Sequence, residues 1–156
     1  PNITPRTEYE HRKAEQLRLI REGDWKHPVT ALDCDWEPQA FSEIAKGLEQ
    51  EPEGGRRCLR CFDLRLRKTA EAAKNGGYDY FTTTLSISPL KDAQKLNEIG
   101  EALAEEYGVS YLPSDFKKKE GYKHSVELSQ KYHLYRQDYC GCIFSKQERE
   151  AQKNRQ

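Results

Sequence analysis

Residues 56–89 read RRCLRCFDLRLRKTAEAAKNGGYDYFTTTLSISP, and this stretch decides the expected fold. Apolar side chains recur at helical spacing over residues 62–73, and the turn signal Asn75-Gly76-Gly77 ends the pattern. Residues 80–85 then combine aromatic and β-branched side chains, as strands do, before a Ser-Pro pair ends the run. The sequence therefore predicts a helix that starts near Cys58, followed by a strand.

Similar patterns on either side of this stretch predict further helices and strands. The expected helices lie between Thr4 and Gly23, over 41–48 and over 96–107, and the expected strands over 27–32 and 109–112. Strands separated by helices of this length favour a parallel sheet in an α/β fold, with function at the carboxyl ends of the strands. The pattern is irregular from residue 115 onward, and residues 146–156 are polar on all sides, as in a frayed helix or a tail.

Composition narrows the class of protein. Lys plus Arg and Asp plus Glu total 26 each, so the net charge does not indicate a protein that binds polyanions over its whole surface. A local basic patch is compatible with this balance. The sequence contains neither an apolar run of membrane-spanning length nor a signal-peptide pattern, so we expect a cytoplasmic protein without a membrane partner. Five cysteines in such a protein favour metal or redox use over structural disulfides.

Cys58 and Cys61 are three residues apart at the expected start of a helix. Both sulfurs can lie on one helical face near free backbone N–H groups, and the positive end of the helix dipole stabilises thiolates. Such thiolates suit an iron–sulfur cluster, a zinc site or a disulfide-exchange pair, and the spacing does not choose among them. Two unrelated thiols on a helix are the simpler alternative.

Cys140 and Cys142 flank Gly141, whose backbone freedom allows two sulfurs to lie close together. A disulfide across one residue closes a tight ring, and strained disulfides are the easily reduced, catalytic kind. The alternative is a pair of metal ligands that complete a four-cysteine site with Cys58 and Cys61. Cys34, between two aspartates, is expected to be a bystander.

Four blocks together resemble one family, the QueH-type epoxyqueuosine reductases. In order along the chain, the blocks are residues 54–62, 82–91, 115–119 and 135–142. The resemblance extends from Pro1 to about Ser145, and the combined blocks are more specific than either cysteine pair alone.

The resemblance implies a Rossmann-like (HUP-type) α/β domain with a parallel sheet and flanking helices. It also implies an oxidoreductase that removes the epoxide oxygen of epoxyqueuosine at the wobble position of tRNA, the last step of queuosine synthesis. Carried over by motif, Cys58 and Cys61 are ligands of a [4Fe-4S] cluster. Cys140 and Cys142 are then a redox-active pair or ligands of an additional iron nearby.

The sequence departs from the family at its N-terminus. Family members begin with a strand that ends in a Cys-Cys-x-x-Cys-Ser segment, then a helix and a second strand, and nothing here matches these parts. Pro1-Asn2-Ile3 resembles the loop after that second strand. The expected organisation is therefore a single, N-terminally truncated domain over 1–145, missing two strands and two cluster ligands, with a polar tail over 146–156.

The expected reaction needs an electron source, an acid and contacts to the substrate. The cluster, supplied by an unidentified electron donor, passes two electrons to the epoxide C–O bond. The leaving oxygen needs an acid or a metal, and the candidates are Asp115, Tyr139 and an iron near the second cysteine pair. Contacts to the nucleoside or its phosphates are expected from Thr84, Ser88, Lys91 and Arg136. The alternative function is a zinc-stabilised RNA-binding module, with the four paired cysteines as a closed site and no catalysis.

Overall fold

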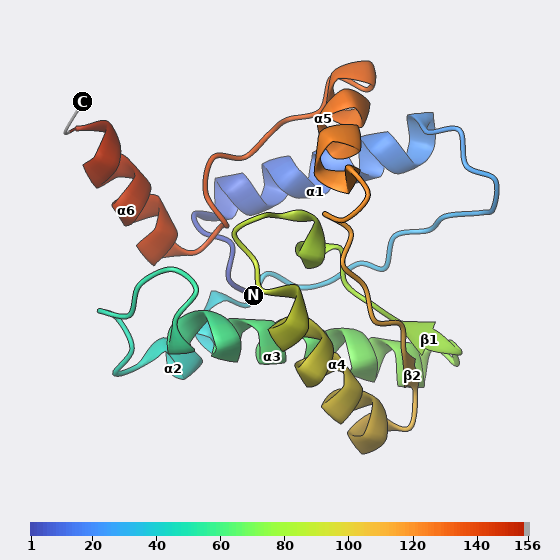
Figure 1. Ribbon diagram of the computed structural model, residues 1–156, viewed down its shortest axis with the longest axis horizontal. Helices are drawn as coiled ribbons and strands as arrows, with labels where there is room; N and C mark the ends of the chain where they lie inside the picture. The colour runs from blue at the N-terminus through green and yellow to red at the C-terminus, as the bar shows by residue number, and fades with distance from the viewer. Residues whose placement is uncertain (155–156) are drawn as a thin grey trace. The chain divides into compact units, whose positions relative to one another are not determined.

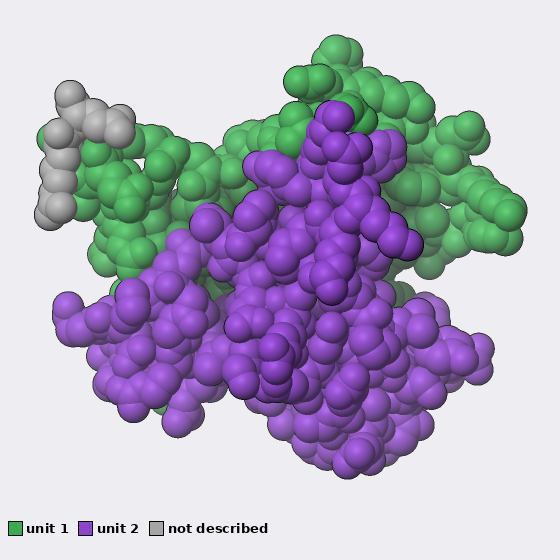
Figure 2. Space-filling view, in the orientation of Figure 1, with its two compact units in different colours: residues 1–43, 126–156 green, residues 44–125 purple. Residues whose placement is uncertain are grey.

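The computed structural model describes residues 1–154, which form an α/β protein with six α-helices, one 3₁₀ helix and two short strands (Figure 1). In chain order these are α1 (Arg6–Glu22), α2 (Pro38–Ala45), α3 (Arg56–Asn75), β1 (Tyr80–Phe81), η1 (Leu85–Ile87), α4 (Ala93–Tyr107), β2 (Ser110–Tyr111), α5 (Gly121–Lys131) and α6 (Ile143–Lys153). The chain divides into two compact units, residues 44–125 and residues 1–43 with 126 onward (Figure 2). The single domain over 1–145 stays a prediction.

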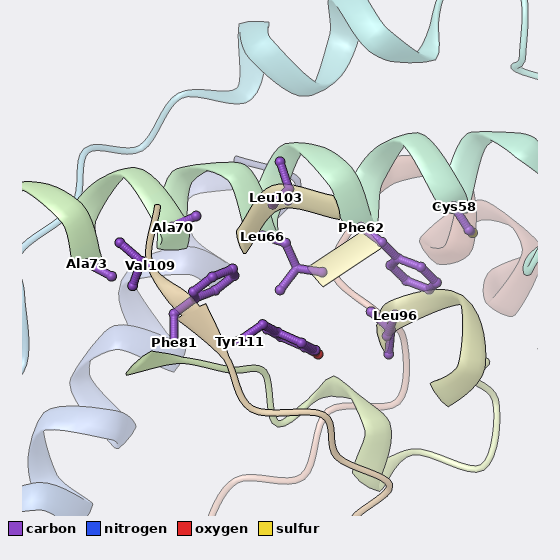
Figure 3. Packing of buried hydrophobic residues seen from close by; sticks show 10 residues of the cluster. All are labelled: Cys58, Phe62, Leu66, Ala70, Ala73, Phe81, Leu96, Leu103, Val109 and Tyr111. Atoms are coloured by element: carbon purple, nitrogen blue, oxygen red, sulfur yellow. The ribbon is translucent and has the colours of Figure 1, made fainter. Parts of the chain in front are cut away.

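The unit formed by residues 44–125 holds the hydrophobic core, between helices α3 and α4 and the strands (Figure 3). Helix α3 directs a stripe of buried side chains into this core because apolar residues three or four apart share one helical face. Phe81 of β1 and Tyr111 of β2 pack ring against ring, with centroids 5.1 Å apart. The predicted helical stripe that ends at the Asn75-Gly76-Gly77 turn is confirmed.

The two strands pair in parallel, and α4 connects one to the other. Tyr80 lies beside Ser110 and Phe81 beside Tyr111, which confirms the predicted parallel pairing. Helix α4 passes so close to β2 that a methyl group on Gly100 would come within 2.4 Å of the Tyr111 ring. Glycine is therefore required at this point of the helix, despite its low helix propensity.

A buried polar network ties together the loops that follow β1 and β2. The hydroxyl oxygens of Ser114 and of the fully buried Ser86 lie 3.1 Å apart. The Ser86 hydroxyl also accepts the backbone N–H of Phe116 at 3.3 Å. Asn97 of α4 both accepts from and donates to the Ser114 backbone, at 3.0 and 3.2 Å. These bonds fix the carboxyl ends of the strands, the edge at which function is expected in a parallel sheet.

In the other unit, α1 lies beside the segment that leads into α6. Thr4 donates its backbone N–H to the Gly141 carbonyl at 2.8 Å, and Trp36 donates its indole N–H to the Ile3 carbonyl at 2.8 Å. The rings of Phe41 and Phe144 lie 6.3 Å apart. No helix in residues 1–154 has the length and apolar character needed to cross a bilayer.

The predicted strand over residues 27–32 is wrong. These residues form no strand, and Val29 and Leu32 are 43% and 59% exposed. The segment starts beside a proline, which has no N–H for a ladder, and no other strand pairs with it.

The predicted strand over 80–85 is correct only at Tyr80-Phe81. The Thr83 hydroxyl accepts the Leu85 N–H at 3.2 Å, and the chain then turns into η1. The predicted strand over 109–112 is likewise reduced to Ser110-Tyr111.

The irregular region after residue 115 contains α5, which sequence patterning missed because this helix has no buried residue. Residues 146–153 belong to α6, so the predicted polar segment at the C-terminus is helical up to residue 153. The last two residues of the predicted tail, Arg155 and Gln156, lie outside the described part of the chain.

Candidate functional site

Cys58 and Cys61 lie in the first two turns of α3, where the sequence placed them. Both are buried, and Cys58 Sγ accepts the backbone N–H of Gly54 at 3.2 Å. Gly54 reaches this position with a φ of 89°, a conformation that glycine adopts at little cost. A helix start and an N–H donor at the sulfur are features that cysteine metal sites share.

Arg57 fixes the loop that precedes this pair. Its side chain is almost completely buried, and one guanidinium nitrogen donates to the carbonyl oxygens of Leu48, Glu49 and Glu51 at 3.1, 3.0 and 2.5 Å. The loop so held contains Gly54, whose N–H contacts Cys58. Sequence patterning does not reveal this role of Arg57, because its carbonyl partners lie six to nine residues upstream.

Cys140 and Cys142 are thiols whose sulfurs lie 3.5 Å apart. Cys142 is buried at the N-cap of α6, where its sulfur accepts the Ser145 N–H at 3.4 Å. The Cys140 N–H donates in turn to the Ser145 hydroxyl at 3.3 Å. The sequence predicted a close sulfur pair here, and the geometry agrees.

Gly141 makes this pair possible in two ways. Its φ is 119°, a conformation that side-chain-bearing residues rarely adopt. A methyl group there would also lie 3.1 Å from both Ile3 and Arg12. The Cys-Gly-Cys segment is thus closely covered by the N-terminal part of its own unit.

The two candidate acids differ in charge state. Burial raises the pKa of Tyr139, and the Glu8 carboxylate raises it further, so Tyr139 keeps its proton at neutral pH. Lys117 Nζ forms an ion pair with Asp115 Oδ1 at 2.9 Å. Its interaction with Lys117 lowers the pKa of Asp115, which is therefore a carboxylate at neutral pH.

Three of the four predicted substrate contacts lie in the loop after β1. Thr84 is exposed, and the Ser88 hydroxyl accepts the Leu90 N–H at 3.3 Å. Lys91 forms an ion pair with Glu53 at 2.5 Å, so a phosphate would have to compete with this carboxylate. Arg136 lies in the other unit, near the second cysteine pair in sequence, and donates to the Ser129 hydroxyl at 2.9 Å.

The two cysteine pairs lie in different units of the chain. Within residues 1–154, no three His, Cys, Asp or Glu side chains come together in an arrangement that could hold a metal ion. Each pair lies at the start of a helix in an α/β protein, and such pairs serve in thiol redox chemistry or as metal ligands. Two cysteine pairs so placed are features expected of a cysteine-dependent redox or metal-binding protein.

Comparison with known proteins specifies this class further. A family model described as epoxyqueuosine reductase QueH matches residues 1–148, and the chain belongs to this family. It is 44% identical over 149 residues to the epoxyqueuosine reductase QueH of Staphylococcus epidermidis, which covers 93% of the chain and 63% of the relative. The Streptococcus pyogenes protein of the same name is 44% identical over 146 residues, covering 92% and 57%.

A more distant relative, the epoxyqueuosine reductase QueH of Thermotoga maritima, is 35% identical over 156 residues. This match covers 96% of the chain and 77% of the relative. The chain spans about three fifths of the length of the Staphylococcus and Streptococcus relatives.

Proposed function

We propose that this chain forms part of an epoxyqueuosine reductase, which converts epoxyqueuosine to queuosine at the wobble position of tRNA. The names of its relatives support the reaction, and the sulfur pair of Cys140 and Cys142, 3.5 Å apart, carries the proposal for this chain. The parallel strands joined by α4 are compatible with a larger Rossmann-like (HUP-type) sheet. The setting is cytoplasmic, where tRNA is modified.

The dithiol can supply the two electrons that the reaction consumes. Removing an epoxide oxygen as water to leave an alkene takes two electrons and two protons. Two thiols that become a disulfide release two electrons and two protons, so the first turnover balances without another reductant. An electron donor of the cell then returns the disulfide to the dithiol.

Tyr139 is the favoured proton donor to the leaving oxygen. It is next to Cys140 in sequence, and its raised pKa keeps the phenol protonated at neutral pH. A general acid must hold its proton before the transition state, which Asp115 in its ionised form does not. Asp115 instead pairs with Lys117 and Lys118 beside the loop of Thr84, Ser88 and Lys91.

Cys58 and Cys61 are proposed as metal ligands. A [4Fe-4S] cluster takes four thiolates, and α3 presents two of them with a backbone N–H already directed at one sulfur. The two residues thus fit half of a cluster site, and such a cluster would supply single electrons when bound. An additional iron near Cys140 and Cys142 is the corresponding proposal for the second pair.

Substrate contacts are proposed from two basic and two hydroxyl side chains. Thr84, Ser88 and Lys91 follow β1 at the carboxyl edge of the sheet, where ligands bind in parallel α/β folds. Lys91 and Arg136 carry the charge needed for phosphates of tRNA.

The second candidate function is a zinc-stabilised RNA-binding module, favoured by the same two helix-start cysteine pairs. Iron with acid-labile sulfide in the full-length protein purified without oxygen supports the reductase. Stoichiometric zinc without iron, and no turnover, supports the module.

The reductase proposal is tested by substitution of Cys140. A bacterial strain that lacks its own epoxyqueuosine reductase receives the full-length gene as wild type, Cys140→Ser or Cys34→Ser. The exposed Cys34 is the matched control, since it lies away from both pairs in sequence. We expect epoxyqueuosine to accumulate in tRNA only with Cys140→Ser. Normal queuosine in that strain would exclude the redox role.

A further inference from the structure

Arg12 of α1 holds the segment that carries the second cysteine pair. One of its guanidinium nitrogens donates to the Cys140 carbonyl at 3.2 Å, and another donates to the Tyr139 carbonyl at 3.2 Å. Its Nε donates to Glu8 at 2.7 Å, one helical turn away. Both side chains of this ion pair are mostly buried, at 13% and 15% exposed.

Other contacts from the N-terminal residues act on Tyr139 and Gly141, the two neighbours of Cys140. The guanidinium of Arg12 lies 5.1 Å from the centre of the Tyr139 ring. Tyr139 donates its hydroxyl to the Thr4 carbonyl, and Thr4 donates its N–H to the Gly141 carbonyl, both at 2.8 Å. The backbone on both sides of Cys140 is therefore fixed by groups outside the cysteine segment.

We infer that Arg12 is a positioning residue that holds the Cys140–Cys142 pair in its dithiol conformation and thereby makes its disulfide easier to reduce. The inference rests on the redox role proposed above. Sulfurs 3.5 Å apart must approach further to bond, and we expect closure of a ring across one residue to move the backbone on both sides of Gly141. The two carbonyls that Arg12 holds resist that movement, so the contacts favour the dithiol.

Glu8 has a supporting part in this arrangement. It accepts from Arg12 Nε and also from the Tyr135 hydroxyl, at 3.2 Å. The carboxylate fixes the plane of the guanidinium, which leaves the two remaining nitrogens directed at the carbonyls. Lysine in place of Arg12 keeps the charge but has one nitrogen for these three acceptors.

Arg18 provides a matched control on the same helix. Its side chain donates to the carbonyls of Tyr132 and His133 at 3.1 and 3.2 Å and pairs with Glu15 at 3.0 Å. Arg12 and Arg18 thus make the same kind of contact with two successive carbonyls, and each pairs with carboxylates of α1, Arg12 with Glu8 and Arg18 with both Glu15 and Glu22. Only Arg12 holds the carbonyl of a cysteine.

The test is the thiol–disulfide equilibrium of the full-length protein in glutathione buffers, without oxygen. Trypsin releases both cysteines in one peptide, residues 137–146, whose mass after alkylation reports the disulfide fraction. The free energy of one charge-assisted hydrogen bond corresponds to a change of about tenfold in an equilibrium constant. We expect Arg12→Ala to favour the disulfide by about this factor, Arg12→Lys by less, and Arg18→Ala to match the wild type.

Two results would overturn the inference: an Arg12→Ala equilibrium equal to that of Arg18→Ala, or a shift toward the dithiol. Circular dichroism of each variant identifies loss of folding, and Arg12→Lys remains informative if Arg12→Ala does not fold. The readout needs no tRNA. An Arg12-dependent equilibrium in a protein that makes no queuosine would support the positioning role and contradict the reductase proposal.

Discussion

At the scale of single residues, spacing in the sequence located both cysteine pairs, and the structure places each at the start of a helix. Spacing could not find Arg12, because its carbonyl partners are 127 and 128 residues away in the chain. The pair formed by Glu8 and Arg12 is recognisable as a helical i, i+4 contact, but that pattern is typical of any exposed helix.

Gly141 is expected to tolerate no side chain. Gly141→Ala places a methyl group at φ 119° and 3.1 Å from Arg12 and Ile3, so we predict a loss of about 1–3 kcal/mol in the free energy of unfolding. Gly47→Ala is the control, because Gly47 also has a positive φ but nothing lies within 4 Å of the added methyl. Urea unfolding of both variants measures the difference, and an equal loss would contradict the role of the contacts.

Cys58 and Cys61 are expected to be needed for bound iron. In the full-length protein purified without oxygen, Cys58→Ala or Cys61→Ala should remove most of the visible absorption of an iron–sulfur cluster, because each loses one thiolate ligand. Cys34→Ala should keep it, since Cys34 is exposed in a loop. Unchanged iron and sulfide in both α3 variants would refute the ligand assignment.

At the scale of elements, apolar periodicity predicted α3 and α4 because both bury a stripe against one core. Helix α5 buries no residue, so periodicity has no apolar face to detect. The segment at 27–32 has a strand-like composition, but a strand also needs a partner, and sequence composition does not reveal partners. The shortening of β1 follows from one local contact, the Thr83 hydroxyl on the Leu85 N–H.

Glu15 of α1 is expected to make stability depend on acid pH. Its bonds from Arg18 and from the Tyr135 N–H lower its pKa from 4.5 to about 2. Because the pKa of Glu15 is lower in the folded state than in the unfolded state, ionised Glu15 stabilises the fold above about pH 4.5. This stabilisation is lost as pH falls toward 2. We predict that Glu15→Gln flattens the decline of the urea midpoint between pH 6 and 3. Parallel wild-type and variant curves would contradict this.

At the scale of the whole molecule, the redox proposal depends on one of the two units. The contacts described above for the Cys140–Cys142 segment come from residues 1–43 or from residues that follow 126. The core between α3, α4 and the strands belongs to the other unit, which carries Cys58 and Cys61. The proposed electron source and the proposed metal ligands can therefore be tested separately.

The most direct measurement is a single turnover. Full-length protein is reduced, freed of reductant without oxygen, and mixed with one equivalent of tRNA that contains epoxyqueuosine. Nucleoside analysis measures queuosine, and the peptide of residues 137–146 measures disulfide. We predict equal amounts of queuosine and of the Cys140–Cys142 disulfide, and neither product with Cys142→Ser. Queuosine formed while both cysteines remain thiols would contradict the account.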